Sequence, residues 1–174
     1  MALTIAALVP GTALATHSNG QGPGKDFRNG SDKGFCPTPF GTFPCHVAVN
    51  GQGSDAAGSG LPATGSWFID ITTGGFLGLP DPVSISGAVV CLHAGPNLGG
   101  NDAWARLRID VSNTPLAPLG FTVSDRATDN GEGANSSGPD ASTGFLNAPG
   151  TACPPIPIAV SPILQGNITI HDGI

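Results

Sequence analysis

The acidic side chains that could bind a metal are gathered in one glycine-rich stretch of the chain. Asp125, Asp129, Glu132 and Asp140 follow one another there, and the glycines between them permit sharp turns. Carboxylate oxygens are the ligands that Ca²⁺ prefers, but this spacing fits neither an EF-hand nor a nonapeptide repeat. Acidic loops of this composition are most often solvated hairpin ends. The four residues are therefore weak calcium candidates, and we expect no metal or cofactor.

A second candidate surface is built from Trp104, Arg106 and Arg108. These residues alternate with the apolar residues of the segment 103–111, which predicts a strand with one core face and one wet face. A tryptophan beside arginines on the wet face could stack on a sugar ring or anchor a protein partner. The alternative is that another part of the chain covers this tryptophan, because tryptophan is mostly buried.

The sequence matches no known catalytic arrangement. Its histidines, His17, His46, His93 and His171, are spread along the chain without the spacing of a metal motif. The G-x-S-x-G motif of serine hydrolases does not occur, and the single glutamate makes a glycosidase carboxylate pair hard to nominate. We therefore expect a protein that is not an enzyme.

The beginning of the chain predicts export. Residues 1–15 combine a short apolar run with the small-residue cleavage site Ala13-Leu14-Ala15, and the run is too short to span a bilayer. Residues 16–34 are polar and glycine-rich, which predicts a flexible tail. Residues 35–174 have the length of one β-domain. The expected location is therefore secreted and extracellular.

The charge of the chain disfavours two classes of partner. The formal net charge is −6, and Lys and Arg together number only 6. Nucleic acids and anionic membranes both attract basic surfaces. After the first fifteen residues, no stretch approaches the roughly 20 apolar residues of a spanning helix. We expect neither nucleic-acid binding nor membrane insertion.

Four cysteines in an exported chain are expected to form two disulfides, and three pairings exist. Sequence alone does not choose between them. Cys36 and Cys45 are close in sequence and flanked by prolines, which favours a local bridge. Cys91 then pairs with Cys153, closing a loop of roughly 60 residues that is worth about 4 kcal/mol in loop-closure entropy. A zinc site is disfavoured because no C-x-x-C occurs.

Short alternating apolar runs and abundant turn residues, with 27 Gly and 17 Pro, are typical of strands joined by turns. Strands are predicted for residues 46–50, 66–72, 83–92, 103–111, 119–125 and 167–171. No segment shows a sustained helical period. The sequence predicts an all-β antiparallel meander of about six to eight strands, arranged as a two-sheet sandwich or a small closed barrel. The barrel closes if the C-terminal strand pairs with the first one, near His46.

Four segments together resemble a known group of proteins. They are residues 16–26, residues 87–92, residues 121–140 with Asp-Asn-Gly-Glu at 129–132, and residues 166–172. They are similar to segments of small exported actinobacterial proteins that carry an uncharacterised β-rich domain. The resemblance implies no activity, cofactor or catalytic residue. It implies a structural cysteine at Cys91 partnered near Cys153, and it does not imply the bridge between Cys36 and Cys45.

The export signal, the low charge and the lack of catalytic motifs favour an exported, non-catalytic β-domain that binds an extracellular or cell-envelope partner. One alternative is a structural, self-assembling extracellular protein, because a polar tail and a neutral β-surface suit association through strand edges. The other is a small-ligand carrier, if the sheet closes into a barrel with room inside.

Overall fold

A computed structural model of the chain describes residues 25–54, 63–95, 101–131, 138–143, 146–147 and 160–171. These residues form an antiparallel β-structure, as predicted, interrupted by one short 3-10 turn, η1 (Phe76–Gly78). None of the described ranges contains a helix long and apolar enough to cross a membrane. The predicted export signal, residues 1–15, lies outside them.

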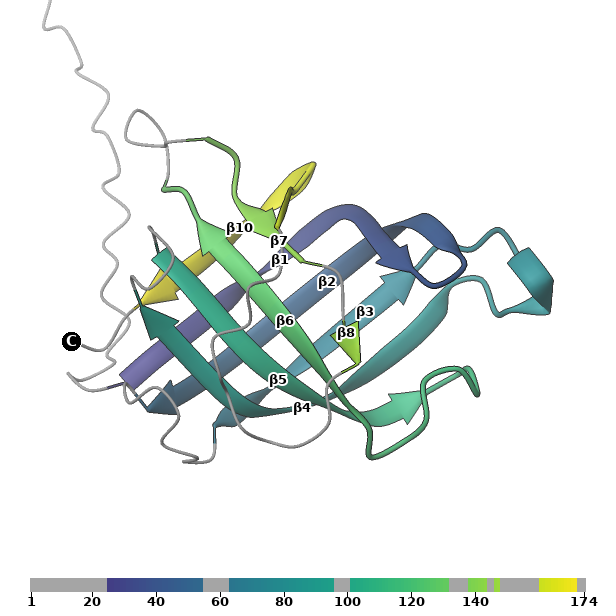
Figure 1. Cartoon of the computed structure of the whole chain (residues 1–174), viewed down its shortest axis with the longest axis horizontal. Coiled ribbons are helices and arrows are strands. Elements are labelled where there is room, and N and C mark those ends of the chain that lie inside the picture. The colour runs from purple at the N-terminus through teal and green to yellow at the C-terminus, as the bar shows by residue number, and fades with distance from the viewer. Residues whose placement is uncertain are drawn as a thin grey trace, which may run out of the picture.

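The described ranges contain six strands of eight or more residues: β1 (Lys25–Thr38), β2 (Gly41–Ser54), β3 (Thr64–Ile71), β4 (Val83–Gly95), β5 (Asn101–Ser112) and β6 (Thr122–Asp129). The shorter strands are β7 (Ala141–Ser142), β8 (Leu146–Asn147), β9 (Ser161–Pro162) and β10 (Gln165–His171). All belong to one sheet in the order β10-β1-β2-β3-β4-β5-β6-β7-β9, with β8 attached to β6 (Figure 1). The six predicted strands correspond to β2 to β6 and β10.

Neither the predicted two-sheet sandwich nor the predicted closed barrel is confirmed. Strand pairing builds a single sheet of ten strands, and β10 and β9 are its two ends. The sheet curls strongly, so that β5 and β6 pass over β1 and β2 (Figure 1). The segment 161–171 runs along the opening, because β9 pairs with β7 at one end of the sheet and β10 pairs with β1 at the other.

The predicted flexible tail, residues 16–34, is wrong from Lys25 onward, where β1 begins. This strand pairs with β2 along its whole length and with β10 on its other side, so ladder hydrogen bonds hold both of its edges. Its polar composition therefore does not prevent it from being a central strand. The C-terminal strand β10 pairs with β1, and not with the strand at His46 as predicted.

Glycines on β2 allow the tight curl of the sheet. Gly51 faces Val89, and Gly53 faces the main chain at Leu92, although β2 and β4 are not neighbours in the sheet. A Cβ atom on Gly53 would lie 2.3 Å from the Leu92 carbonyl oxygen, which is a clash. Two strands that do not hydrogen-bond can thus touch inside the fold.

The interior has two differently built ends. Around its middle, β2, β3, β4 and β5 contribute a buried apolar core, which includes Val47, Val49, Trp67, Ile69, Val89, Leu92, Leu107 and Ile109. Toward the start of β1 the interior becomes charged, with a smaller apolar cluster beside it that includes Ile168 and Ile170 of β10. We call the charged region the ionic end and define it by its side chains, which are Arg28, Asp32, Asp125, Asp129 and Asp140. The other end of the interior contains the cavity described next, and we call it the apolar end.

Candidate functional site

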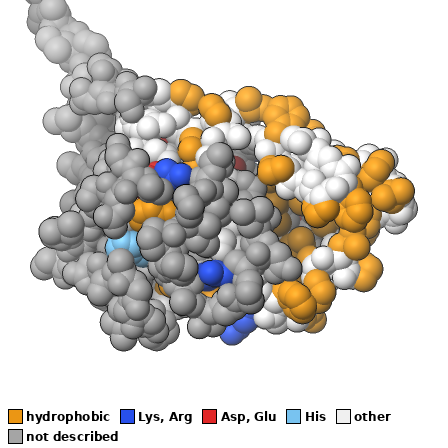
Figure 2. Space-filling view, in the orientation of Figure 1, with side chains coloured by type: hydrophobic (Ala, Val, Ile, Leu, Met, Phe, Trp, Pro, Cys, Tyr) orange, Lys and Arg blue, Asp and Glu red, His pale blue; other side chains and the backbone are white. Residues whose placement is uncertain are grey.

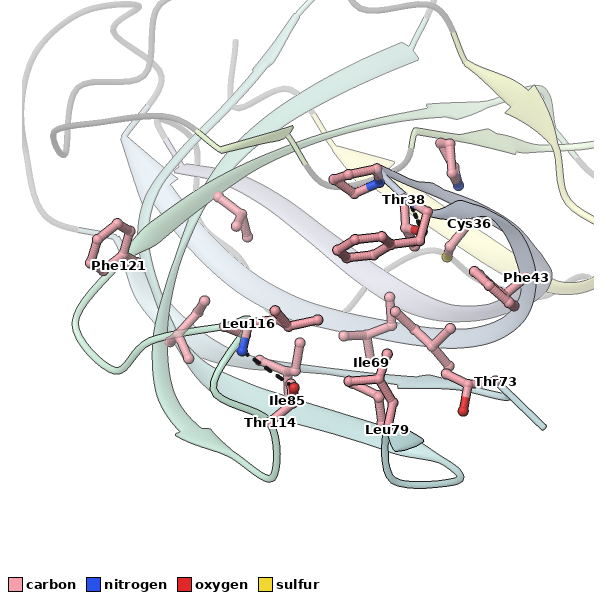
Figure 3. Close-up of a pocket in the computed structure, with 18 of the residues that line it drawn as sticks. Cys36, Thr38, Phe43, Ile69, Thr73, Leu79, Ile85, Thr114, Leu116 and Phe121 are labelled. Carbon is pink, nitrogen blue, oxygen red and sulfur yellow. Dashed lines mark hydrogen bonds between the residues drawn. The ribbon is translucent and has the colours of Figure 1, made fainter. Parts of the chain in front are cut away.

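A cavity of about 400 Å³ opens at the apolar end. Its walls come from the β1–β2 hairpin on one side and from β3, β4 and the β5–β6 connection on the other, as Figure 3 shows for Phe43, Ile69, Ile85 and Leu116. Not one of the described lining residues is charged. The volume lies within the range of natural small-molecule sites, roughly 300–1,000 Å³.

The polar atoms of the wall are already engaged by the protein. The Thr38 hydroxyl donates to the Gly41 carbonyl at 2.8 Å, and the Thr73 hydroxyl donates to the Pro80 carbonyl at 2.9 Å. The Thr114 hydroxyl accepts a hydrogen bond from the amide two residues later, at 3.3 Å (Figure 3). These bonds hold the loops that frame the cavity. What the cavity offers a ligand is therefore mainly apolar packing.

Trp67 forms part of the cavity wall and is fixed in place by a bond across two strands. Its indole Nε1 donates to the Arg108 carbonyl at 2.9 Å. Gly87 lies directly opposite Trp67 in the ladder, and a Cβ there would lie only 1.9 Å from the same carbonyl oxygen. The glycine thus leaves the carbonyl accessible to the indole. This arrangement gives the cavity a rigid aromatic wall.

The mouth of the cavity is surrounded by exposed apolar side chains. Phe40 and Phe121, both lining residues, are about half exposed, and Leu116 is 54% exposed. Phe76 of η1 is also exposed and packs on Phe43, with ring centroids 5.7 Å apart. Figure 2 shows hydrophobic side chains gathered at this end of the molecule. Exposed apolar groups that cluster around a cavity are typical of a binding site.

The disulfide between Cys36 and Cys45 joins β1 to β2 beside the cavity, and Cys36 is a lining residue. This pairing confirms the bridge favoured from sequence. Cys91 is also disulfide-bonded, while its predicted partner, Cys153, lies outside the described residues. The local bridge keeps the hairpin wall of the cavity in position.

At the ionic end, Arg28 of β1 forms an ion pair with Asp125 of β6, and both side chains are buried. Asp32 lies four residues further along the same face of β1, where it is buried and hydrogen-bonded to Ser142 of β7. Burial raises the pKa of Asp32, against the attraction of Arg28. Burial also lowers the pKa of Arg28 to about 10, although Asp32 opposes this. These contacts join strands that do not pair in the sheet.

Two further carboxylates accept hydrogen bonds from the free edge of β10. The Ile168 amide donates to Asp140 Oδ2 at 2.8 Å, and the Ile170 amide donates to Asp129 Oδ2 at 3.2 Å. The other oxygens of both carboxylates accept bonds from backbone amides of the turn after β6. In a closed barrel, these β10 amides would donate to the backbone of a neighbouring strand. Here the carboxylates of Asp140 and Asp129 accept their hydrogen bonds instead.

The calcium candidates therefore have structural roles in the parts of the chain that the structure describes. Asp125 is paired with Arg28, and Asp129 and Asp140 bind backbone amides. Glu132 lies outside the described residues. No group of three or more His, Cys, Asp or Glu side chains within the described ranges is arranged to hold a metal ion.

Two of the three residues of the candidate surface on β5 are covered, which agrees with the alternative weighed for Trp104 from the sequence. Trp104 is only 2% exposed and stacks on His93, and Arg106 is buried as well. Only Arg108 of the three predicted residues is exposed, where it pairs with Asp110. The apolar face of β5 also ends early, because Val111 is 62% exposed. The alternation of residues correctly predicted the strand, but it cannot reveal that the second face is covered at Trp104 and Arg106.

Comparison with known protein families, with curated proteins and with solved structures finds no match for this chain. The functional argument therefore depends on the geometry of the fold. Sequence reasoning missed the cavity, because its lining residues come from several separate strands and connections and share no local motif. It also missed Arg28 and Asp32, which lie in the segment taken for a tail.

Proposed function

We propose that this chain is an exported, non-catalytic binding domain and that the open cavity at the apolar end is its binding site. The observation that carries the proposal is a cavity of about 400 Å³ with an uncharged lining and a mouth of exposed apolar side chains. Leaving such surface in water is unfavourable, and a bound molecule would remove it from water. The disulfide supports an oxidising, extracellular location.

This geometry favours the carrier alternative over binding through the outer face of β5. A ligand in the cavity would contact the walls formed by Phe43, Ile69 and Ile109, and the exposed side chains at the mouth would cover its outer part. The sheet need not close for this purpose, because the cavity lies between the hairpin and the β5–β6 connection. An extracellular or cell-envelope partner would insert an apolar group at the same place.

The test is a matched pair of variants, in each of which one alanine is replaced by phenylalanine. Ala117 lines the cavity and is half-buried, so Ala117→Phe should fill part of it. Ala88 pairs with exposed Ser66 and Arg108 on the outer face of the sheet, so Ala88→Phe is the control. We expect the protein to bind the fluorescent apolar probe N-phenylnaphthylamine, and Ala117→Phe to weaken binding about tenfold or more. Equal binding by both variants, or none by the wild type, would overturn the proposal.

Self-association is a second candidate, favoured by the exposed apolar side chains at the mouth. Leu116 lies on the mouth, whereas Val111 is similarly exposed but does not line the cavity. If copies of the chain associate through the mouth, sedimentation should reveal concentration-dependent dimers that Leu116→Ser abolishes and Val111→Ser does not. A monomer at all concentrations would exclude this candidate.

A further inference from the structure

We infer that the cavity takes uncharged hydrophobic molecules with the bulk of about two to three aromatic rings and discriminates against anionic ones. This inference rests on the proposed function and adds the chemical class of the ligand. It follows from the volume of the cavity, from the chemistry of its wall and from the charges deeper in the same interior.

The volume sets the size of the ligand. A cavity of roughly 150 Å³ lined by apolar side chains is known to take one benzene molecule. The cavity at the apolar end measures about 400 Å³, which is between two and three times that volume. Aromatic side chains from both walls, Phe43 and Trp67, suit flat rings that can stack or meet them edge to face.

The described wall of the cavity contains no charged side chain that could pair with a charged ligand. Among the described lining residues there is no Lys, Arg or His to pair with an anion, and the hydroxyls of Thr38 and Thr73 already donate to backbone carbonyls. A sulfonate or carboxylate carried in with the rings would lose water without gaining a partner. The wall therefore favours a neutral ligand.

The ionic end adds a second reason to exclude anions. Even without Asp32, whose pKa burial raises, its buried carboxylates Asp125 and Asp140 outnumber its buried cation, Arg28. The interior behind the cavity therefore has an excess of negative groups, which repel an anion through a medium of low dielectric constant.

Two probes with the same ring system test the inference. N-phenylnaphthylamine is neutral, and anilinonaphthalenesulfonate carries one additional sulfonate. Binding is measured by probe emission and by energy transfer from Trp67, in a Trp104→Phe variant that leaves Trp67 as the sole tryptophan. We expect the neutral probe to bind at least about tenfold more tightly. Equal or tighter binding of the sulfonate would overturn the inference but leave the proposed function intact, whereas binding of neither probe would overturn both.

A charge placed at the mouth sharpens the test. Leu116→Lys puts an ammonium group on the exposed rim, where it can meet a sulfonate, and Val111→Lys adds the same charge outside the cavity. We expect only Leu116→Lys to tighten sulfonate binding, by about threefold or more. The same gain in both variants would show that the anion responds to net charge alone, which would contradict selection within the cavity.

Discussion

The ionic end and the apolar end of the interior are built from different kinds of side chain. At the ionic end, Arg28, Asp125 and Asp140 join strands that the ladder leaves unpaired, and they are buried. At the apolar end, a disulfide holds the β1–β2 hairpin, and the side chains around Ile69 and Ile85 leave a cavity open to solvent. Charged side chains thus connect strands across the opening of the sheet, and uncharged side chains surround a cavity at the other end.

This difference assigns stability alone to the ionic end and ligand binding to the apolar end. A buried ion pair is directional, so it fixes which strands lie opposite each other across the opening. Apolar contacts are not directional, so the uncharged wall of the cavity can bind a ligand without breaking a specific hydrogen bond or ion pair. Substitutions at the ionic end should therefore change stability without changing ligand affinity, whereas substitutions at the apolar end should change ligand affinity.

The largest effect is expected from Asp125→Ala. This substitution leaves Arg28 buried without its ion-pair partner, and removing one member of a buried pair costs about 3–5 kcal/mol. Urea unfolding should show this loss in the free energy of unfolding. The double variant Arg28→Met with Asp125→Leu should recover most of it, since two apolar groups need no partner. A loss below about 1 kcal/mol in the single variant would mean that the pair does not hold the ends of the sheet together.

The disulfide belongs to the apolar end and should affect both stability and binding. Replacing Cys36 and Cys45 by alanine opens a loop with a sequence separation of 9 residues, which loop-closure entropy values at about 2.5 kcal/mol. Because Cys36 also lines the cavity, probe affinity should fall in the same variant. Unchanged affinity in the alanine pair would show that the hairpin wall needs no bridge.

Asp32 makes the ionic end sensitive to pH. Since burial raises the pKa of this carboxyl, the folded state holds the proton more tightly than the unfolded chain does. The stability contributed by Asp32 is therefore lost as the pH rises through its folded pKa. We expect Asp32→Asn to raise the Tm at pH 7, and the difference from the wild type to vanish below the ordinary aspartate pKa. A lower Tm for the variant at pH 7 would contradict this sign.

The smallest effect is expected from Arg108→Gln. The pair of Arg108 with Asp110 has a short hydrogen bond of 2.7 Å, but the two side chains are 48% and 40% exposed. That hydrogen bond lowers the pKa of Asp110, yet solvent screens exposed pairs. Thermal unfolding should show no resolved change in Tm, and probe affinity should stay the same. A clear fall in either quantity would mean that this outer face contributes more than its exposure indicates.

Sequence reasoning predicted the strands that have alternating apolar residues. The predicted segments 103–111 and 66–72 overlap β5 and β3 because period-two patterns reflect a real core face. It could not predict β1, whose buried Arg28 and Asp32 read as solvated polar residues until their partners on β6 and β7 are known.

The candidate site was less accessible to sequence reasoning than the strands. Trp104 and Arg106 occupy the predicted outer face of β5, but alternation does not report whether a face is covered. The cavity wall combines Cys36, Ile85 and Ala117 from distant parts of the chain. Only the curl of the sheet brings these residues together, and that curl depends on close contacts such as Gly53 against Leu92.

The central claim is that a ligand occupies the apolar end and leaves the ionic end unchanged. Titration of the ¹⁵N-labelled protein with N-phenylnaphthylamine, followed by amide NMR, tests it most directly. We predict saturable shifts for the amides of Ile69, Ile85 and Ile109, which line the cavity, and unchanged signals for Ile168 and Ile170, which bind the carboxylates. Shifts concentrated at Ile168 and Ile170, or no saturable shifts at the cavity, would contradict the account.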